Sequence, residues 1–386
     1  MNILVDMKFM WPSERATMYS GMAVELIAFV NTIPEEHKDR YTLLFNKESE
    51  EEMHALFPDY KYVSVDFSKK SRFALIDWLK KKNKFKRFVS TYQADIYFNL
   101  VNTDYVTWFT FPYPYVGVHH DLSLLRNSKF SLRSLFYQLT LPSYYRYKFK
   151  HCSHIISISN FVKEDAINYF HLDQNTASKF TTIYNTVLKI NNSSEPSGYD
   201  FSNKYILTVN AVRPSKNLET LFKAFALIKD RTELNLILVG ATKNNIYWDK
   251  TLNPLINELN ISDRIFVLQN LKNEELRYIY EKASLFITTS LREGFGNTPI
   301  EAAYYGCPVI STTCESLPEV TMGLVNYYEP PTDEIALSNL ILKILETPPT
   351  NGELEKISGI FLERYNSQNR TSEIEKVFEA IIRVLS

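Results

Sequence analysis

The sequence contains little cysteine and little glycine, and both shortages narrow its interpretation. Three cysteines among 386 residues, Cys152, Cys307 and Cys314, form no paired spacing. Neither a disulfide framework nor a cysteine-ligated metal site is therefore predicted, and a reducing cytosol is the natural compartment. Only 10 glycines occur, so each glycine in a loop marks a place where backbone freedom or close approach to a ligand is needed.

Long hydrophobic runs are also absent. No window of the sequence holds eighteen uninterrupted apolar residues, which argues against a membrane-spanning helix. The first residues, MNILVDMKFMW, lack a basic leader and are interrupted by Asp6, so no signal peptide is predicted. We expect a cytoplasmic protein that rests at most on the inner face of the cell membrane.

The net charge of -1 hides an asymmetry between the two halves. Residues 1–190 carry 24 Lys and Arg against 19 Asp and Glu, whereas the remainder carries 19 against 25. The densest basic segment runs from Lys69 to Arg87 and is interleaved with apolar residues such as Trp78 and Phe85. Such a segment fits contact with anionic lipid headgroups, and it equally fits a solvated basic helix face. No nucleic-acid-binding motif accompanies it, so no nucleic-acid partner is expected.

Strand-like apolar runs alternate with helix-like segments in two series, as expected for parallel sheets covered by helices on both faces. A polar stretch, NNSSEPSG from Asn191, has the composition of a linker between them. The chain is long enough for two domains of about 190 residues each. We predict a first domain over 1–190, a linker over 191–200, a second domain over 201–365, and a helix over 366–386 that packs back on the first domain. The predicted strands are Asn2–Val5, Tyr41–Phe45, Tyr62–Val65, Asp95–Leu100, Tyr115–Val118, His154–Ile158 and Phe180–Ile183 in the first half, and Tyr205–Val209, Leu234–Val239, Arg264–Leu268, Leu285–Thr289 and Val309–Ser311 in the second.

The stretch REGFGNTPIEAAYYGCPVIS, from Arg292 to Ser311, carries the most functional information. A polar loop that opens a helix between two apolar strands is where α/β proteins bind phosphates. Glu301 fits a helix-capping box in which Thr298 is the N-cap and Pro299 the first helical residue. No capping or packing role explains Glu293, which stands in a glycine-flanked turn.

Other strand ends carry further candidates. Arg213 and Lys216 share one loop before a helix and together would neutralise a diphosphate; the alternative is a solvated loop. In the first half, His119, His120 and Asp121 end an apolar run, where a histidine is placed to hydrogen-bond a substrate or transfer a proton. Core packing, or helix capping by Asp121, is the alternative for these three residues.

The conjunction of motifs resembles glycosyltransferase family 4 of the GT-B fold. Glu293-Gly-Phe-Gly through Glu301 is similar to that family's Glu-x7-Glu signature, and RPSKN from Arg213 resembles its phosphate-binding loop. SLPEV from Ser316 matches the element that follows, while HDL from His120, ISISNF from Ile156 and IYNTV from Ile183 have counterparts in the first half. The resemblance covers nearly the full length, and it implies two Rossmann-like domains facing each other across a deep cleft.

The resemblance also implies roles for individual residues. Glu301 would bind the ribose hydroxyls of a nucleotide, Glu293 the hydroxyls of the donor sugar, and Arg213 and Lys216 the diphosphate leaving group. His120 would contact the donor sugar near the reacting centre. Such enzymes retain anomeric configuration and need neither a metal nor another cofactor. The remaining donor-binding candidates, chiefly backbone positions at strand ends and helix starts, are Ser20, Gly21, Gly240, Asn270, Phe295, Gly296, Asn297 and Thr298.

The sequence therefore predicts a hexosyltransferase that uses a nucleotide diphosphate sugar. Its acceptor would be a glycan or a lipid-linked sugar in bacterial surface polysaccharide synthesis (capsule, O-antigen or exopolysaccharide). The aromatic run Tyr97–Tyr115 lies in the half expected to bind acceptor, although core packing explains most of its residues. Two alternatives stay open: a nucleotide-sugar epimerase of the same fold, and a non-catalytic sugar-nucleotide-binding subunit. The nucleotide base, the sugar, the linkage and the oligomeric state are not specified by these motifs.

Overall fold

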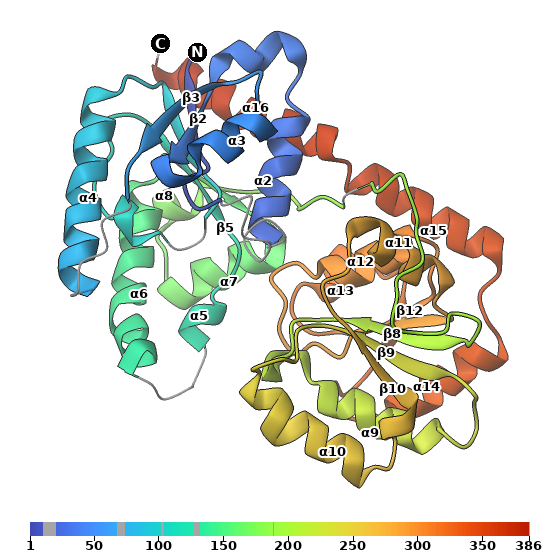
Figure 1. Cartoon of the computed structure of the whole chain (residues 1–386). Helices are drawn as coiled ribbons and strands as arrows, with labels where there is room; N and C mark the ends of the chain where they lie inside the picture. Colours follow the sequence, from blue (N-terminus) through green and yellow to red (C-terminus); the bar gives the residue numbers. More distant parts are fainter. Residues whose placement is uncertain (11–20, 68–73, 102–103, 127–131, 188, 386) are drawn as a thin grey trace. The chain divides into compact units, whose positions relative to one another are not determined.

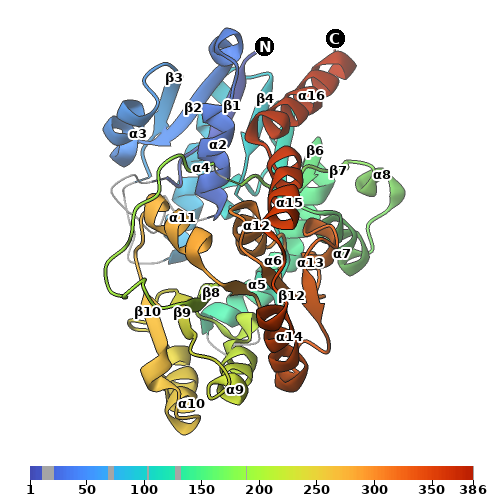
Figure 2. The same ribbon diagram turned by 90° about the vertical axis from the view of Figure 1, so that its right-hand side faces the viewer.

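The computed structural model describes residues 1–10, 21–67, 74–101, 104–126, 132–187 and 189–385. The chain forms two compact units. Unit 1 comprises Met1–Leu188 together with Ser367–Ser386, and unit 2 comprises Lys189–Asn366. Each unit contains its own parallel sheet with helices on both faces (Figures 1 and 2). This confirms the predicted α/β class and the two Rossmann-like domains.

The sheet of unit 1 has seven strands in the order β3-β2-β1-β4-β5-β6-β7. Every adjacent pair is parallel, so the carboxyl ends of all seven strands lie at one edge. All seven were predicted from their apolar runs. Their bounds are β1 (Ile3–Asp6), β2 (Tyr41–Asn46), β3 (Lys61–Val65), β4 (Ile96–Asn99), β5 (Tyr115–His119), β6 (His154–Ser157) and β7 (Phe180–Thr182).

Alternate residues of the unit 1 strands meet different helices, as the two-residue period of a strand requires. Tyr97 packs with Phe85, whereas the next residue, Phe98, meets Phe29 and Phe378. One face is thus covered by α4, α6 and α7, and the other by α2 and α16. The helices of the unit are α2 (Gly21–Asn31), η1 (Glu35–Arg40), η2 (Lys47–Ser49), α3 (Glu50–Leu56), α4 (Ala74–Thr91), η3 (Tyr105–Thr107), α5 (Ser123–Arg126), α6 (Leu132–His151), α7 (Asn160–Phe170), α8 (Gln174–Ala177) and α16 (Ser367–Leu385).

The aromatic run between Tyr97 and Tyr115 belongs to the unit 1 core. Tyr97, Phe109 and Tyr115 are buried, and Tyr105 and Trp108 pack against them. The structure therefore confirms core packing as the role of most of these side chains.

The C-terminal helix α16 belongs to unit 1 and packs beside α2 (Figures 1 and 2). Three kinds of contact hold it there. The Thr371 hydroxyl lies 2.6 Å from that of Thr32, and the Tyr41 hydroxyl donates a 2.9 Å hydrogen bond to the carboxylate of Glu375. Phe378 adds an edge-to-face contact with the Phe98 ring, with 5.2 Å between ring centroids.

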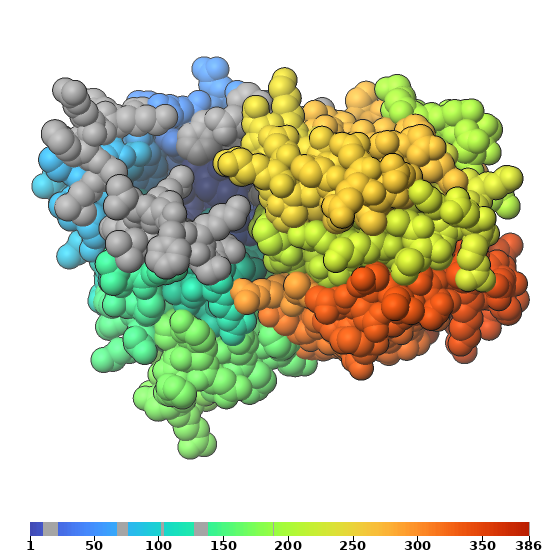
Figure 3. All heavy atoms as spheres, turned by 90° about the horizontal axis from the view of Figure 1, so that it is seen from below, coloured from blue at the N-terminus to red at the C-terminus, as the bar shows by residue number. Residues whose placement is uncertain are grey.

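The sheet of unit 2 has six parallel strands in the order β10-β9-β8-β11-β12-β13. Helices α9, α10 and α14 lie next to one another on one face of this unit (Figures 1 and 3). The predicted buried stripe of α9 is confirmed, because Leu218, Leu221, Phe222 and Phe225 are all fully buried. The strands are β8 (Tyr205–Val209), β9 (Asn235–Val239), β10 (Ile265–Leu268), β11 (Leu285–Ile287), β12 (Val309–Thr312) and β13 (Asn326–Tyr328). The helices are η4 (Pro214–Lys216), α9 (Leu218–Ile228), η5 (Trp248–Leu252), α10 (Asn253–Glu258), η6 (Ser262–Arg264), α11 (Asn273–Lys282), α12 (Asn297–Tyr304), α13 (Leu317–Val320), α14 (Glu334–Glu346) and α15 (Asn351–Arg364).

Among the elements of unit 2 that were not predicted are the strand β13 and the helix α14. β13 is a three-residue edge strand with an exposed Asn326, which leaves no alternating pattern to recognise. α14 does carry a sequence signal: Asp333 accepts hydrogen bonds from the backbone N–H groups of Ile335 and Ala336, and Leu337 and Ile341 form a buried stripe. An N-cap aspartate followed by apolar residues at helical spacing would have identified this helix.

Candidate functional site

The predicted donor residues of unit 2 lie at one edge of its sheet. Arg213 and Lys216 follow β8, Gly240 follows β9, Asn270 follows β10, and Glu293 follows β11. All these strands are parallel, so their carboxyl ends bring the four loops to the same edge. This is the position at which open α/β sheets bind ligands.

Lys216 and Glu293, 77 residues apart in sequence, form an ion pair. Both side chains are half-buried, at 16% and 13% exposure, so the pair is less screened by water than a surface pair would be. Two further hydrogen bonds join the loop after β8 to the loop after β11. The Thr289 hydroxyl donates to the Lys216 carbonyl at 2.8 Å, and the Leu291 N–H donates to the Ser215 carbonyl at 2.8 Å. Arg213 lies in the same loop with an exposed side chain.

The turn that carries Glu293 is held from the loop after β12. The backbone N–H of Glu293 donates a 2.6 Å hydrogen bond to the carboxylate of Glu315. The Ser316 hydroxyl lies 2.8 Å from the carbonyl of Glu293 and 3.0 Å from that of Phe295. Ser316 belongs to the motif noted in the sequence, whereas Glu315 was not singled out. The sequence feature that would have indicated Glu315 is an acidic residue in the polar loop that follows a predicted strand.

Phe295 and Gly296 complete the turn by packing. The Phe295 side chain is buried against Tyr365, with 5.5 Å between ring centroids, so only its backbone is placed to meet a donor. Gly296 has φ +92°, and a Cβ there would lie 2.7 Å from Cδ2 of Leu317. The backbone conformation therefore favours glycine strongly, and any other residue would also have to displace the Leu317 side chain.

The predicted capping box of α12 is wrong. The helix begins at Asn297, its N-cap is Gly296, and no side chain caps it. Pro299 is the third helical residue, where its missing N–H costs nothing because the first four N–H groups of a helix have no intrahelical acceptor. Gly296 in the left-handed conformation starts the helix two residues earlier than the local pattern indicates. The backbone N–H groups of Asn297 and Thr298 thus lie in the first turn, at the positive end of the helix dipole.

Glu301 is consequently not a helix cap. Its carboxylate instead accepts a 2.9 Å hydrogen bond from the Tyr280 hydroxyl of α11. Burial raises the pKa of this carboxyl above its ordinary value, and the hydrogen bond from Tyr280 opposes the shift. The acid is held at the site by a partner that sequence reasoning did not identify, since the two residues lie on different helices.

The two other predicted donor positions at strand ends, Gly240 and Asn270, differ in how closely they are packed. A Cβ on Gly240 would lie 2.4 Å from the backbone oxygen of Asn210, so only glycine fits between the loops after β8 and β9. Asn270 is exposed and has φ +56°, a left-handed conformation that asparagine tolerates better than most residues. Gly240 is thus fixed by close packing of two loops, whereas Asn270 lies on the surface.

In unit 1, the three residues that follow Val118 have separate environments. Nε2 of His120 lies 2.7 Å from the Leu100 carbonyl, which only accepts, so Nε2 carries the proton of the neutral ring. Burial lowers the pKa of His120 to about 4, and the ring is neutral at pH 7. His119 is fully buried against Tyr145, and Asp121 accepts hydrogen bonds from the backbone N–H (2.9 Å) and hydroxyl (2.7 Å) of Ser123 at the start of α5. Packing for His119 and capping for Asp121, the alternatives left open by the sequence, are thus their observed roles.

Gly21 is the first residue of α2. The preceding candidate, Ser20, lies outside the described residues, as do Lys69, Lys70 and Arg72 of the basic segment.

A polar cluster at the carboxyl ends of β1 and β4 was missed by the sequence interpretation. Lys8 is paired with Asp6, and its Nζ lies 2.6 Å from Oδ2 of Asp104. Asp6 also accepts hydrogen bonds from Tyr97 and, at 3.0 Å, from Nδ2 of Asn99. The sequence signal is an acid and a lysine two residues apart at the end of the first apolar strand. The cluster joins the ends of β1 and β4 to Asp104 through one lysine and shared hydrogen bonds.

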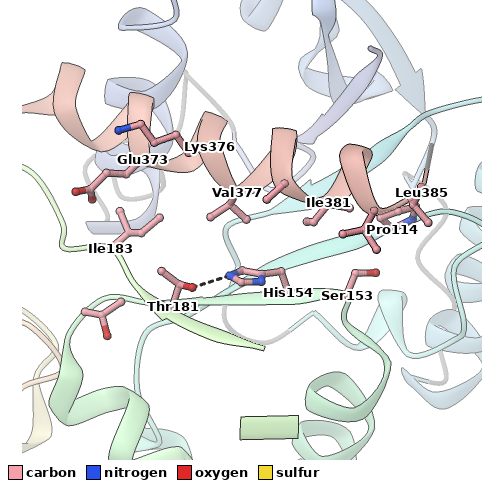
Figure 4. Close-up of a pocket in the computed structure, with 13 residues that line it drawn as sticks. Pro114, Ser153, His154, Thr181, Ile183, Glu373, Lys376, Val377, Ile381 and Leu385 are labelled. Carbon is pink, nitrogen blue, oxygen red and sulfur yellow. Dashed lines mark hydrogen bonds between the residues drawn. The ribbon is translucent and has the colours of Figure 1, made fainter. Parts of the chain in front are cut away.

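An apolar groove of about 760 Å³ lies beneath α16 (Figure 4). On the helix side, Val377, Ile381 and Leu385 point into it, and His154 and Thr181 face them from β6 and β7 (Figure 4). None of the predicted site residues lines this groove.

No group of three or more His, Cys, Asp or Glu side chains among the described residues is placed to hold a metal ion. Within the same part of the chain, every helix is too short or too polar to cross a bilayer.

Comparison with known sequences locates a family match in unit 2. Residues 190–358 match the family described as glycosyl transferases group 1. The chain is 29% identical over 240 residues to the O-antigen chain mannosyltransferase RfbU of Salmonella typhimurium, covering 60% of this chain and 64% of that protein. It is 32% identical over 146 residues to the O-antigen chain mannosyltransferase B of Escherichia coli, covering 37% of each. The chain thus spans less than two thirds of the length of either relative.

Solved structures share the fold over nearly the whole chain. Sucrose-phosphate synthase from Thermosynechococcus elongatus aligns with a TM-score of 0.71 and 18% identity, covering 99% of both chains. HepE of Anabaena, solved in complex with UDP-glucose, also aligns with a TM-score of 0.71 and 18% identity, covering 98% of this chain and 100% of that one. At such identities the likeness establishes the fold alone. The chain therefore has the GT-B fold, and its second unit matches the glycosyl transferases group 1 family over residues 190–358.

Proposed function

We propose that the protein is a retaining, metal-independent glycosyltransferase of family 4. It moves a hexose from a nucleotide diphosphate sugar to a glycan or a lipid-linked acceptor. The observation that carries the proposal is the Lys216–Glu293 ion pair, which lies at the carboxyl edge of the unit 2 sheet within the matched region. A carboxylate can accept hydrogen bonds from sugar hydroxyls and a cation can pair with a diphosphate, and this ion pair supplies both groups at one place.

The reaction would break the bond between the anomeric carbon of the sugar and the diphosphate oxygen, and would join that carbon to the oxygen of an acceptor hydroxyl, whose proton passes to the departing diphosphate. Negative charge then develops on the departing diphosphate. Lys216, Arg213 and the first-turn N–H groups of α12 would stabilise it as a preorganised set of positive groups. Glu301, oriented by Tyr280, would accept hydrogen bonds from the ribose hydroxyls. We retain His120 as a proposed contact of the donor sugar, since its bond to Leu100 fixes a neutral ring in one tautomer.

The names of the relatives favour mannose as the transferred sugar. Two O-antigen chain mannosyltransferases and the serotype-specific mannosyltransferase WbdA of Escherichia coli match this chain. We therefore propose a mannosyl transfer in the assembly of a bacterial surface polysaccharide. HepE was solved with UDP-glucose, so UDP-glucose is the donor to compare with GDP-mannose.

Nucleotide binding tests this proposal by thermal unfolding. One nucleotide of UDP, GDP, dTDP and ADP is expected to raise the melting temperature, because a ligand at 100 times its Kd stabilises the folded state by about 2.7 kcal/mol. Glu301→Gln should weaken that shift. Glu258→Gln, an acid of α10 away from the site edge, is the matched control and should not. Absence of any shift at millimolar concentration would contradict the donor site.

Turnover separates the proposal from its two rivals. A nucleotide-sugar epimerase would convert the donor to a product of equal mass without acceptor. A non-catalytic binding subunit would show the thermal shift but no transfer to a membrane fraction that contains lipid-linked acceptors. Transfer of labelled mannose, with release of the nucleotide diphosphate, is the expected result.

We also propose that α4 contacts an anionic membrane surface. Its exposed face carries Lys80, Lys86 and Arg87 together with Ile76 and Leu79, which are 43% and 42% exposed. Two aromatic residues of α4 face inward: Phe85 is buried, and Nε1 of Trp78 donates to the Tyr105 carbonyl at 3.0 Å. The proposal thus rests on basic and aliphatic side chains that share the outer face, a composition suited to lipid headgroups.

Flotation with vesicles containing anionic lipid tests the membrane contact. The wild-type protein is expected to float with the vesicles, and the triple variant Lys80→Glu/Lys86→Glu/Arg87→Glu to remain at the bottom. Reversal of the exposed Lys223 and Lys250 in unit 2 changes the net charge without touching α4 and serves as control. Equal flotation of the two variants would show that α4 is only a solvated basic helix.

A further inference from the structure

Glu315 has a backbone conformation that its residue type disfavours. Its φ is +52°, in the left-handed region. Among the described residues, seven that are not glycine have positive φ, and four of them are asparagines, which adopt this conformation more readily than most residues. Glutamate has no such preference, so the conformation of Glu315 is maintained by its surroundings.

Glu315 and the two residues after it contact the Glu293 turn at consecutive points. The Glu315 carboxylate accepts the Glu293 N–H at 2.6 Å, and the buried Ser316 hydroxyl lies 2.8 Å from the Glu293 carbonyl. Leu317 then fills the space beside Gly296. The backbone of Glu293 is held on both its N–H and its carbonyl side by residues that come after β12.

We propose that Glu315 is a positioning residue that fixes the Glu293 backbone so that the Glu293 carboxylate faces Lys216 and the donor sugar. This inference rests on the function proposed above. The Glu315 carboxylate occupies the N–H of Glu293, so that group is not offered to a phosphate. The N–H groups of Asn297 and Thr298 at the start of α12 stay among those placed to meet the diphosphate. Glu315 thereby directs the Glu293 side chain, and not the Glu293 N–H, to the donor.

Glu315→Gly separates this role from a purely structural one. Glycine relieves the left-handed conformation while removing the carboxylate, so the two effects on stability oppose each other. We expect the melting temperature to stay within about 2 °C of the wild type. Hydrogen exchange of the peptide covering residues 291–297 should nevertheless accelerate about tenfold, since the amide of Glu293 loses a charge-assisted bond.

Met322→Gly is the matched control. Met322 has φ +53°, lies seven residues from Glu315 in the same unit, and is half-buried. Its replacement by glycine relieves the same conformation and leaves the hydrogen bonds of Glu315 and Ser316 to the Glu293 turn in place, so exchange over 291–297 should not change. Glu315→Gln keeps an oxygen that accepts the Glu293 N–H and is expected to be intermediate.

Turnover shows whether the contact of Glu315 with the Glu293 backbone matters for the reaction. The probes are GDP-mannose and UDP-glucose, and the readout is nucleotide release. Glu315→Gly should lower kcat about tenfold or more on whichever sugar nucleotide the wild-type protein turns over, and Met322→Gly should not. A protein that turns over neither compound would refute the proposed mannosyl transfer and its UDP-glucose alternative, while the exchange measurement would still decide on the positioning of Glu293.

Three results would overturn the inference. Exchange over 291–297 that is equal in Glu315→Gly and Met322→Gly would show that Glu315 does not hold the turn. Accelerated exchange with an unchanged kcat would show that the contact only joins two loops. A fall in melting temperature of more than about 5 °C in Glu315→Gly, with Glu315→Gln behaving like the wild type, would make Glu315 a stability residue.

Discussion

Lys216→Met is expected to lower sugar-transfer turnover by about 10²- to 10³-fold, the largest effect of any single change at the site. The substitution keeps the aliphatic stem and removes the cation. The backbone of the loop remains attached through the bonds from Thr289 and Leu291, so the fold of unit 2 should persist. The loss falls on the transition state, because Lys216 would meet charge that develops only as the diphosphate leaves. Steady-state kcat with GDP-mannose measures the loss of turnover, and the melting temperature shows whether unit 2 stays folded.

A double-mutant cycle shows whether the ion pair acts in the reaction or only in the fold. Glu293→Gln removes the other partner, and the combined variant leaves neither charge unpaired. Were the pair merely structural, the combined variant would recover most of the activity lost by Lys216→Met. We expect no such recovery, since each side chain is proposed to bind a different part of the donor. Arg213→Ala, in the same loop but exposed, provides the comparison and should cost about 10²-fold. Activity of Lys216→Met within about threefold of the wild type would remove Lys216 from the proposed mechanism.

Much of the fold follows from patterns within single segments. The stripe of Leu218, Leu221, Phe222 and Phe225 predicts the buried face of α9, and apolar runs such as Tyr205–Val209 predict the strands. These patterns are local, because burial of one helix face or one strand requires apolar residues at a fixed period. The parallel order then places Lys216, Gly240 and Glu293 at one sheet edge without knowledge of any side-chain contact.

The contacts that determine the site arise between segments far apart in sequence. The local pattern TPIE assigns the N-cap of α12 to Thr298, yet the helix begins at Asn297 after Gly296, whose backbone is left-handed and lies against Leu317. Tyr280 orients Glu301 from another helix, and Glu315 holds Glu293 from another loop. No period or spacing in the sequence encodes these pairs. Their prediction needs the three-dimensional arrangement of the loops.

Arg370→Met is expected to destabilise unit 1 by about 3–5 kcal/mol, the typical result of removing one partner of a buried ion pair. Nη1 of Arg370 lies 3.4 Å from the carboxylate of Glu25, and the two side chains are 3% and 0% exposed. Nε of Arg370 also donates to the Tyr184 carbonyl at 3.1 Å. Glu25 would still accept the Thr186 N–H after the substitution, but its charge would be left in the core without the cation. Urea unfolding, with hydrogen exchange to locate the effect in α2 and α16, measures the loss.

Two further variants decide whether charge burial is the cause. Arg383→Met removes an exposed arginine from the same helix and should change the free energy of unfolding by less than about 0.5 kcal/mol. Glu25→Gln combined with Arg370→Met keeps an acceptor for Thr186 and leaves no buried charge, so it should recover part of the stability. If the combined variant is no more stable than Arg370→Met, the loss comes from packing and from the bond to Tyr184.

The helix α16 is separated from the rest of unit 1 by 178 residues of unit 2 in sequence, yet it contributes Arg370, Thr371 and Phe378 to the unit 1 core. Truncation before Ser367 would therefore leave Glu25 without its cation and should be more destabilising than any single substitution in α16.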